Sequence, residues 1–250
     1  MAPKAPATEL RLGRIALVLG GHGIRGGVGA AADHAERIAA RGLFAEVHAG
    51  ALKGEPGLVE TVRAVSAPEI VLAPLLMAEG YTLRAMRRRL DRGLPRAARL
   101  TVCRPIGVHP GLGEMIRTKA LALCAAKSWR PAETTLLIVG HGTERHPDSG
   151  TSTRWHAAQI AARGTFAEVA VAFLDQPPYV PEALDSLTSA RCIAVGLFVD
   201  AGEHGEEDIP ALLAPAGDRA VYAGPLGPDP LVTGLILDQV HAALGTSIAA

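Results

Sequence analysis

The sequence predicts two tandem α/β domains, each built on a doubly wound parallel sheet and related to the other by internal duplication. The segment 34–47, HAERIAARGLFAEV, returns 122 residues later as 156–169, HAAQIAARGTFAEV. An apolar run that ends in Gly-His-Gly precedes each copy, at 15–23 and at 136–142. A repeat of this length indicates duplicated domains, because the repeats of solenoid proteins run to roughly 20 to 50 residues.

Within each copy, predicted strands alternate with predicted helices. Apolar runs in the second copy predict strands at 134–139, 168–174 and 191–198, and helices at 152–163 and 180–189. The first copy repeats this order with strands at 14–19, 46–52 and 69–76, and helices at 29–41, 58–65 and 83–90. Continuous rather than alternating apolar runs, separated by helices, are typical of parallel strands that are buried on both faces.

The two copies also end alike. The segment RPIGVHP at 104–110 parallels GPLGPDP at 224–230, and an amphipathic helix follows each of them. We place the linker near 127–133, which divides the chain into domains at 1–128 and 129–250. Each domain then has about 125 residues, which is a common domain size.

The composition indicates a globular protein of the cytoplasm. Hydrophobic residues make up 48% of the chain, which is enough for two cores. Cys103, Cys124 and Cys192 are odd in number and widely spaced, so we expect buried thiols rather than a disulfide framework. The first dozen residues lack the apolar segment of a secretory signal, and no apolar stretch approaches the roughly 20 residues that span a bilayer. We expect no membrane and no nucleic acid as partner, and a monomer or a homodimer.

The chain has a net charge of zero, but the two predicted domains carry opposite net charges. Residues 1–128 contain 19 lysines and arginines against 10 acidic residues, a balance of +9. Residues 129–250 contain 6 against 15, a balance of −9. This difference either helps the two halves to associate or lets each half bind a partner of opposite charge.

Three candidate functional side chains follow three strands of the second copy. His141 ends the first strand, Asp175 ends the second, and His204 lies in the acidic loop after the third. Ligands of such sheets bind outside the carboxyl ends of the strands, so we expect these side chains at one edge of the sheet. Two imidazoles and a carboxylate are a usual ligand set for Zn²⁺, Fe²⁺, Co²⁺ or Ni²⁺, and also a usual acid–base set.

The first copy has kept only part of this set. Its His22 corresponds to His141, but Lys53 stands in place of Asp175 and Tyr81 in place of His204. We therefore expect no metal site in the first copy. The glycines around His22 are expected to serve the turn from strand to helix, where the backbone approaches closely and a positive φ is needed.

The second copy resembles the sirohydrochlorin chelatases of the CbiX type, which are class II tetrapyrrole chelatases. The resemblance rests on GHGT at 140–143, FLD at 173–175, AGEH at 201–204 and EDIP at 207–210. Both halves match the single-domain unit of that family, so it covers most of residues 14–245. It implies tandem chelatase-like, flavodoxin-like domains, the basic one without a full metal site and the acidic one with it.

The resemblance also implies an activity and a site. The activity is the ATP-independent insertion of Co²⁺, Fe²⁺ or Ni²⁺ into sirohydrochlorin, in cobalamin or siroheme biosynthesis, with Co²⁺ as the expected metal. His141 and His204 would bind the metal, and Asp175 would be the acidic helper among these catalytic residues. The metal would be a substrate, and no organic cofactor is expected. Neutral imidazoles could hold the metal, and one of them could accept a proton as a general base when the metal replaces the two pyrrole protons.

The substrate of such an enzyme carries eight carboxylates, so its binding surface should be cationic. Arg84, Arg87 and Arg88 lie close together on a predicted helix of the basic half, at i, i+3 and i+4. We expect them, with Arg25 and Lys53, to bind the carboxylates of the tetrapyrrole, because guanidinium groups suit carboxylates well. The alternative is an ordinary solvated helix face.

Two other functional classes stay open at this stage. A non-catalytic carrier of metal or tetrapyrrole on a chelatase fold would need the same ligands. A histidine phosphatase would carry Arg-His-Gly at the strand end, whereas this chain has Gly140 before His141. The other histidines add further alternatives. His22, His109 and His146 remain candidates for the site, whereas the duplication favours a structural role for His34 and His156.

Overall fold

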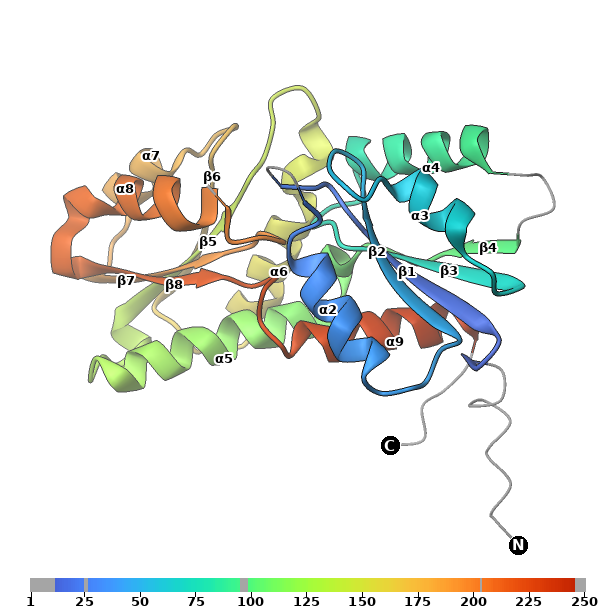
Figure 1. Cartoon of the computed structure of the whole chain (residues 1–250). Coiled ribbons are helices and arrows are strands. Elements are labelled where there is room, and N and C mark those ends of the chain that lie inside the picture. The colour runs from blue at the N-terminus through green and yellow to red at the C-terminus, as the bar shows by residue number, and fades with distance from the viewer. Residues whose placement is uncertain (1–11, 25–26, 95–98, 203, 246–250) are drawn as a thin grey trace, which may run out of the picture. The chain divides into compact units, whose positions relative to one another are not determined.

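The computed structural model describes residues 12–24, 27–94, 99–202 and 204–245, and it contains two four-stranded parallel sheets (Figure 1). The first sheet has the strand order β2-β1-β3-β4. Its strands are β1 (Ile15–Gly21), β2 (Glu46–Ala51), β3 (Glu69–Pro74) and β4 (Arg99–Val102). The second sheet has the corresponding order β6-β5-β7-β8. Its strands are β5 (Thr134–Gly140), β6 (Glu168–Phe173), β7 (Arg191–Gly196) and β8 (Ala220–Pro225).

Helices cover both faces of each sheet, so the predicted doubly wound architecture is confirmed (Figure 1). On the first sheet, α3 (Leu58–Ala64) and α4 (Tyr81–Gly93) cover one face, and α2 (Ala30–Ala39) and α9 (Val232–Leu244) cover the other. On the second sheet, α7 (Val180–Ser186) and α8 (Ile209–Leu213) cover one face, and α5 (Pro110–Ala126) and α6 (Thr151–Ala161) the other.

The central strands explain why the sequence predicts parallel sheets. Every residue of β1 and of β5 is buried, because helices cover both faces and neighbouring strands pair along both edges. Of the four edge strands, β2 and β6 were predicted from the sequence, whereas β4 and β8 were not. In β4 the side chains alternate between exposed and half-buried, and in β8 all six are half-buried. Neither β4 nor β8 contains a buried residue, whereas the predicted edge strands β2 and β6 each end in two buried residues.

The chain packs as two compact units that cut across the sequence repeat. The first unit comprises the described parts of Met1–Leu76, Tyr81–Ile106 and Pro230–Ala250, and the second comprises Met77–Gly80 and Gly107–Asp229. Helix α9 contacts β3 and β4 of the first sheet, whereas α5 contacts β7 and β8 of the second. Each repeat thus gives its last helix to the sheet of the other repeat, which differs from the blocks 1–128 and 129–250 that the repeat predicts.

The two packed units also differ in net charge, as the two sequence repeats do. Counted over the residues of the two units, the first has 16 lysines and arginines against 9 acidic residues, and the second has 9 against 16. The three cysteines are buried free thiols, as predicted. Among the described residues, no helix has the length and apolar character needed to cross a membrane.

Candidate metal site at the carboxyl edge of the second sheet

His141 directly follows the last residue of β5, at the carboxyl edge of the second sheet. Its Nδ1 lies 2.8 Å from the carbonyl oxygen of Gly142. A carbonyl oxygen only accepts hydrogen bonds, so Nδ1 carries the proton in this contact. In a neutral ring, Nε2 then holds the lone pair that can bind a metal ion or accept a proton.

Asp175 lies beside His141, at the end of the neighbouring strand β6. Its Oδ2 is 3.5 Å from His141 Nδ1, and its backbone N–H donates to the carbonyl oxygen of His141 at 2.9 Å. The two side chains are 48% and 61% exposed, so solvent and solutes reach both. The negative charge of the carboxylate beside the imidazole favours the approach of a cation. The structure thus brings together two of the three predicted site residues.

A buried amide, Gln176, supports the loop that follows His141. Its Oε1 accepts the backbone N–H of Thr143 at 2.9 Å and the hydroxyl of Ser149 at 2.6 Å. Gly142 has a φ of 68°, and a Cβ there would overlap the Gln176 side chain. The sequence analysis missed Gln176, although its position directly after Asp175 at a strand end was a usable signal.

A carboxylate and a phenol also meet at this edge. The Tyr179 hydroxyl donates to Glu144 Oε1 at 2.7 Å, and the Glu144 backbone N–H donates to the carbonyl oxygen of Asp175 at 3.1 Å. The hydrogen bond to Glu144, with smaller contributions from desolvation and from nearby carboxylates, raises the pKa of Tyr179. The phenol is therefore a hydrogen-bond donor at neutral pH. Neither residue was predicted as part of the site.

The third predicted site residue, His204, begins a short π-helical segment, His204–Asp208, after β7. Its side chain and the whole of Glu203 lie outside the described residues. Among the residues that the structure does describe, no group of three or more His, Cys, Asp or Glu side chains could hold a metal ion. The pairing of His204 with His141 therefore stays a prediction.

The structure also shows the surroundings of two other candidate histidines, His146 and His109. His146 is half-buried in the loop after His141, and its backbone N–H donates to the carbonyl oxygen of Thr143 at 3.3 Å. His109 caps α5, where its Nδ1 accepts the backbone N–H of Gly111 at 3.0 Å. This contact gives His109 a structural role at the helix start.

The first unit repeats the backbone of the site with different side chains. The Lys53 N–H donates to the carbonyl oxygen of His22 at 2.8 Å, as the Asp175 N–H does to that of His141. Gly23 has a φ of 96°, and a Cβ there would overlap the carbonyl oxygen of Lys53. The glycine next to His22 thus serves a close backbone approach, as predicted, and a cation stands where the second unit has a carboxylate.

The predicted substrate-binding arginines lie on α4 of the first unit. Arg84, Arg87 and Arg88 are exposed, and the guanidinium carbon of Arg88 lies 5.8 Å from the centre of the Tyr81 ring. The neighbouring Arg89 instead donates to the carbonyl oxygen of Leu52 at 2.5 Å, which ties α4 to the end of β2. Lys53 is also exposed, whereas Arg25 lies outside the described residues.

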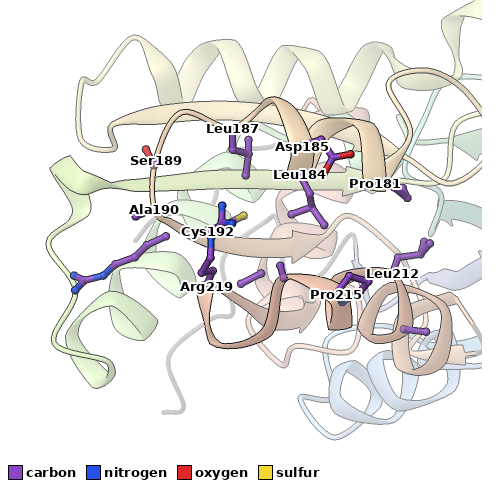
Figure 2. Close-up of a pocket in the computed structure, with 14 residues that line it drawn as sticks. Pro181, Leu184, Asp185, Leu187, Ser189, Ala190, Cys192, Leu212, Pro215 and Arg219 are labelled. Carbon is purple, nitrogen blue, oxygen red and sulfur yellow. The ribbon is translucent and has the colours of Figure 1, made fainter.

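A pocket of about 370 Å³ lies elsewhere in the second unit, between α7, α8 and the amino end of β7 (Figure 2). Its walls include Leu184, Leu187, Leu212 and Cys192, with Arg219 among the polar side chains. The pocket contains none of the predicted site residues. Because β5 and β7 are parallel, the first residues of β7 lie at the sheet edge opposite to His141.

Comparison with known sequences identifies the same family in both repeats. The sequence model of the CbiX family matches residues 16–122 and 135–243. A probable sirohydrochlorin cobaltochelatase of Halobacterium salinarum is 30% identical over 263 residues, covering 90% of each chain. A sirohydrochlorin cobaltochelatase of Methanopyrus kandleri is 28% identical over 139 residues, which cover 44% of this chain and 96% of that protein.

Solved structures agree with this assignment. CbiX, the terminal enzyme of siroheme biosynthesis in denitrifying bacteria, matches with a TM-score of 0.71 at 27% identity, over 92% of this chain and 98% of its own. A multi-domain Deinococcus radiodurans protein with structural similarity to chelatases gives 0.75 at 25% identity, over 91% of this chain and 54% of its own. SirB from Bacillus subtilis, solved with Fe³⁺, shares the fold with a TM-score of 0.72 at 18% identity over 92% and 95% of the two chains.

Proposed function

The chain belongs to the CbiX family, and we propose that it inserts Co²⁺ into the free-base tetrapyrrole sirohydrochlorin, as a step of cobalamin biosynthesis. Fe²⁺ and Ni²⁺ are the alternative metals, and Fe²⁺ would place the same reaction in siroheme biosynthesis. The proposed enzyme is a lyase, and its reaction does not require ATP. The similarity to a probable sirohydrochlorin cobaltochelatase of Halobacterium salinarum and to a sirohydrochlorin cobaltochelatase of Methanopyrus kandleri supports the choice of cobalt.

The observation that carries this proposal is the contact between His141 and Asp175 at the carboxyl edge of the second sheet. The reaction binds one divalent cation and releases the two protons of the pyrrole nitrogens. Nε2 of a neutral His141 can bind the arriving cation and, once the cation has passed to the pyrrole nitrogens, can accept one of these protons, while the other leaves to solvent. The hydrogen bond from Nδ1 to the Gly142 carbonyl oxygen keeps Nε2 unprotonated. The charge of Asp175, 3.5 Å from Nδ1, favours the approach of a cation.

His204 is the proposed second metal ligand. Two protein ligands, His141 and His204, would leave most coordination positions of the cation open, as catalytic metal sites do. A loosely held cation can pass to the four nitrogens of the tetrapyrrole, whereas a cation with four protein ligands would be held too tightly to leave.

The proposed substrate-binding residues are Arg84, Arg87, Arg88, Arg25 and Lys53. The structure describes four of these five residues, and all four side chains are exposed. The first unit, to which they belong, also contains more basic than acidic residues. On α4, the positions of Tyr81, Arg84 and Arg88 fall on one face, while the buried Leu83, Met86 and Leu90 fall on another. Guanidinium groups on one exposed face can bind several carboxylates of one planar substrate at once.

Anaerobic turnover tests the proposed reaction. The purified protein is mixed with sirohydrochlorin and with Co²⁺, Fe²⁺ or Ni²⁺ in turn, and metal insertion is followed by the change in tetrapyrrole absorbance. We expect insertion faster than the spontaneous rate, and fastest with Co²⁺. Tetrapyrrole and metal binding without any acceleration would instead identify a carrier and overturn the enzymatic proposal.

A further inference from the structure

We propose that Gln176 is a positioning residue of the metal-insertion reaction, because it fixes the tautomer and the orientation of the His141 imidazole through the single peptide group that joins Gly142 to Thr143. This inference deepens the proposed function and rests on it for the role of His141. In this proposal Gln176 acts through His141, without touching the cation or the tetrapyrrole.

The peptide group between Gly142 and Thr143 binds both side chains. Its N–H belongs to Thr143 and donates to Gln176 Oε1 at 2.9 Å. Its carbonyl oxygen belongs to Gly142 and lies 2.8 Å from His141 Nδ1. A peptide group is planar and almost always trans, so the direction of the N–H fixes the direction of the C=O on the opposite side. The amide that holds the N–H therefore also aims the carbonyl oxygen at the imidazole.

Each hydrogen bond in this series has only one possible direction. A backbone N–H only donates, so the Gln176 atom that accepts it is the amide oxygen and not the amide nitrogen. A backbone carbonyl oxygen only accepts, so His141 Nδ1 carries the proton. Hydrogen bonds in series also strengthen one another by polarisation. The series thus favours the neutral tautomer of His141 in which Nε2 holds the lone pair for a cation.

Asp175 is the competing acceptor for the same imidazole proton. Its Oδ2 lies 3.5 Å from His141 Nδ1, which is longer than the usual upper limit of about 3.2 Å for an N–H···O bond. The Gly142 carbonyl oxygen lies well within that limit. The Asp175 side chain is also exposed, whereas Gly142 is buried. We therefore assign control of the tautomer to the peptide group rather than to the carboxylate.

The Gln176 side chain is itself held in one place. It is 7% exposed, and its Oε1 also accepts the Ser149 hydroxyl at 2.6 Å. A Cβ on Gly142 would overlap this side chain, and a Cβ on Gly150 would lie 2.7 Å from its Nε2. The amide thus lies between two glycines whose replacement by a larger residue would displace it. A buried amide with such close neighbours provides a fixed acceptor.

The first unit holds the equivalent peptide group in a different way. Ile24 corresponds to Thr143, and its N–H donates to the carbonyl oxygen of Gly27 in the same loop, at 3.1 Å. Gly54 corresponds to Gln176 and offers no side chain. The turn after the strand therefore forms without an amide in the first unit. The amide is specific to the unit in which we expect the metal site.

NMR of the metal-free protein tests the inference without turnover. The imidazole ¹⁵N shifts of His141 distinguish a protonated Nδ1 from a protonated Nε2, and they are measured at pH 8, above the usual histidine pKa of about 6.5. The spectrum of His141→Ala identifies the signals of this ring. Wild type should show the Nδ1–H tautomer. Gln176→Met keeps the length of the side chain but loses the amide oxygen, so it should shift His141 toward the Nε2–H tautomer.

Turnover links the tautomer to the reaction. Gln176→Met should lower kcat for Co²⁺ insertion on the order of tenfold, as the loss of a group that orients a metal ligand commonly does. It should leave KM for the tetrapyrrole near wild type, because Gln176 does not touch the substrate in this proposal. A changed tautomer with the kcat of wild type would overturn the role of Gln176 in the reaction.

Gln176→Glu is the rescue variant. A carboxyl group offers an oxygen to the Thr143 N–H in either protonation state, so the Nδ1–H tautomer should return. Equal loss of this tautomer in Gln176→Glu and Gln176→Met would show that the acceptor does not control it, and would overturn the inference. Retention of the tautomer in Gln176→Met together with its loss in Asp175→Asn would assign the control to Asp175 and would also overturn it.

Ser149→Ala is the matched control, because it removes the other donor to Gln176 Oε1 and leaves the contact with Thr143. It should keep the Nδ1–H tautomer, with kcat near wild type. A change as large as that of Gln176→Met would assign the effect to the loop as a whole and contradict the inference. Circular dichroism and urea unfolding of each variant show that the changes do not come from a loss of fold.

The outcomes separate this inference from the proposed function. If wild type inserts metal into sirohydrochlorin while Gln176→Met keeps both the tautomer and kcat, the inference is wrong and the function stands. If wild type inserts no metal while Gln176→Met changes the tautomer, the control of His141 by Gln176 stands and the enzymatic proposal is wrong.

Discussion

His34 and Thr233 are 199 positions apart in the chain, yet His34 Nδ1 lies 2.8 Å from Thr233 Oγ1 in the core of the first unit. His34 belongs to α2 of the first repeat, and Thr233 belongs to α9, the last helix of the second repeat. This contact joins α9 to a helix of the other repeat. Both side chains are buried, at 0% and 1% exposure, so the hydrogen bond satisfies groups that water cannot reach.

The corresponding contact in the second unit is incomplete. His156 matches His34 in the repeat, and Gly113 on α5 matches Thr233. His156 Nε2 donates to the carbonyl oxygen of Gly107 at 2.9 Å, but Nδ1 is buried without a hydrogen-bond partner among the described residues. A Cβ built on Gly113 would lie 3.3 Å from His156 Nδ1. The second unit thus has the histidine of this pair without the hydroxyl.

The first prediction restores the missing hydroxyl. Gly113→Ser should stabilise the protein more than Gly113→Ala does, by about 1 kcal/mol, because a hydrogen bond to a buried, unpaired nitrogen is added. Gly113→Ala is the control, because it introduces the same Cβ 3.3 Å from His156 Nδ1 and has the higher helix propensity of the two substitutions. Urea unfolding at pH 7 measures the difference, and equal stabilities would show that the serine hydroxyl does not reach His156.

The second prediction concerns the pH dependence of stability. Burial, opposed by the hydrogen bond to Gly107, lowers the pKa of His156 below its usual value of 6.5. The unfolded state therefore takes up a proton as the pH falls through 6.5, while the folded state does not. This contribution to stability is complete above pH 6.5 and is lost as the pH falls toward the lowered pKa, with a slope of at most about 1.4 kcal/mol per pH unit.

Replacement of the histidine isolates this effect. His156→Gln should unfold with a weaker dependence on pH between 7 and 5 than wild type. Burial also lowers the pKa of His241, so some dependence will remain in the variant. The measurement is the free energy of unfolding by urea at half-unit intervals of pH, and parallel curves for the two proteins would contradict the prediction.

The third prediction concerns catalysis at the second sheet. His141→Ala should lower kcat for metal insertion by roughly 10²-fold or more, the usual contribution of a positioned acid–base group. Asp175→Asn keeps the size of the side chain but removes its charge, and it should cause a smaller loss. His22→Ala, at the equivalent place in the first unit, is the control and should stay near wild type. Full activity of His141→Ala would remove His141 from the proposed site.

The fourth prediction concerns the substrate side. Neutralising Arg84 and Arg88 together, by substitution with glutamine, should raise KM for the tetrapyrrole by on the order of tenfold, because charge-assisted hydrogen bonds to carboxylates are lost. The affinity for Co²⁺ should not change. Arg92→Gln removes an exposed arginine from the last turn of the same helix and should leave KM near wild type. An unchanged KM in the double variant would contradict the role of α4 in substrate binding.

Local sequence predicted the central strands and the placement of two site residues. Strands β1 and β5 were recognisable because all of their residues are buried and apolar runs record that burial. His141 and Asp175 could be placed together because both directly follow neighbouring parallel strands, whose carboxyl ends share an edge. Strands β4 and β8 contain no buried residue and were missed, whereas the edge strands β2 and β6, which end in buried residues, were predicted.

The supporting contacts of the site were not predictable in the same way. Gln176 holds Thr143, and Tyr179 holds Glu144, across sequence separations of 33 and 35 residues. Polar loop residues have no periodicity, and a hydrogen bond between two loops depends on how each loop leaves its strand. Only the folded backbone brings these donors and acceptors within reach of one another.

By itself, the sequence determined the duplication, the parallel sheets, the charge difference and the edge at which His141 and Asp175 meet. The tertiary structure decided which sheet each terminal helix covers. An amphipathic pattern predicts that α5 and α9 bury one face, but two sheets from one ancestor offer similar apolar surfaces to both helices. The choice is made by specific contacts, such as that of His34 with Thr233, and these exist only once the chain has folded.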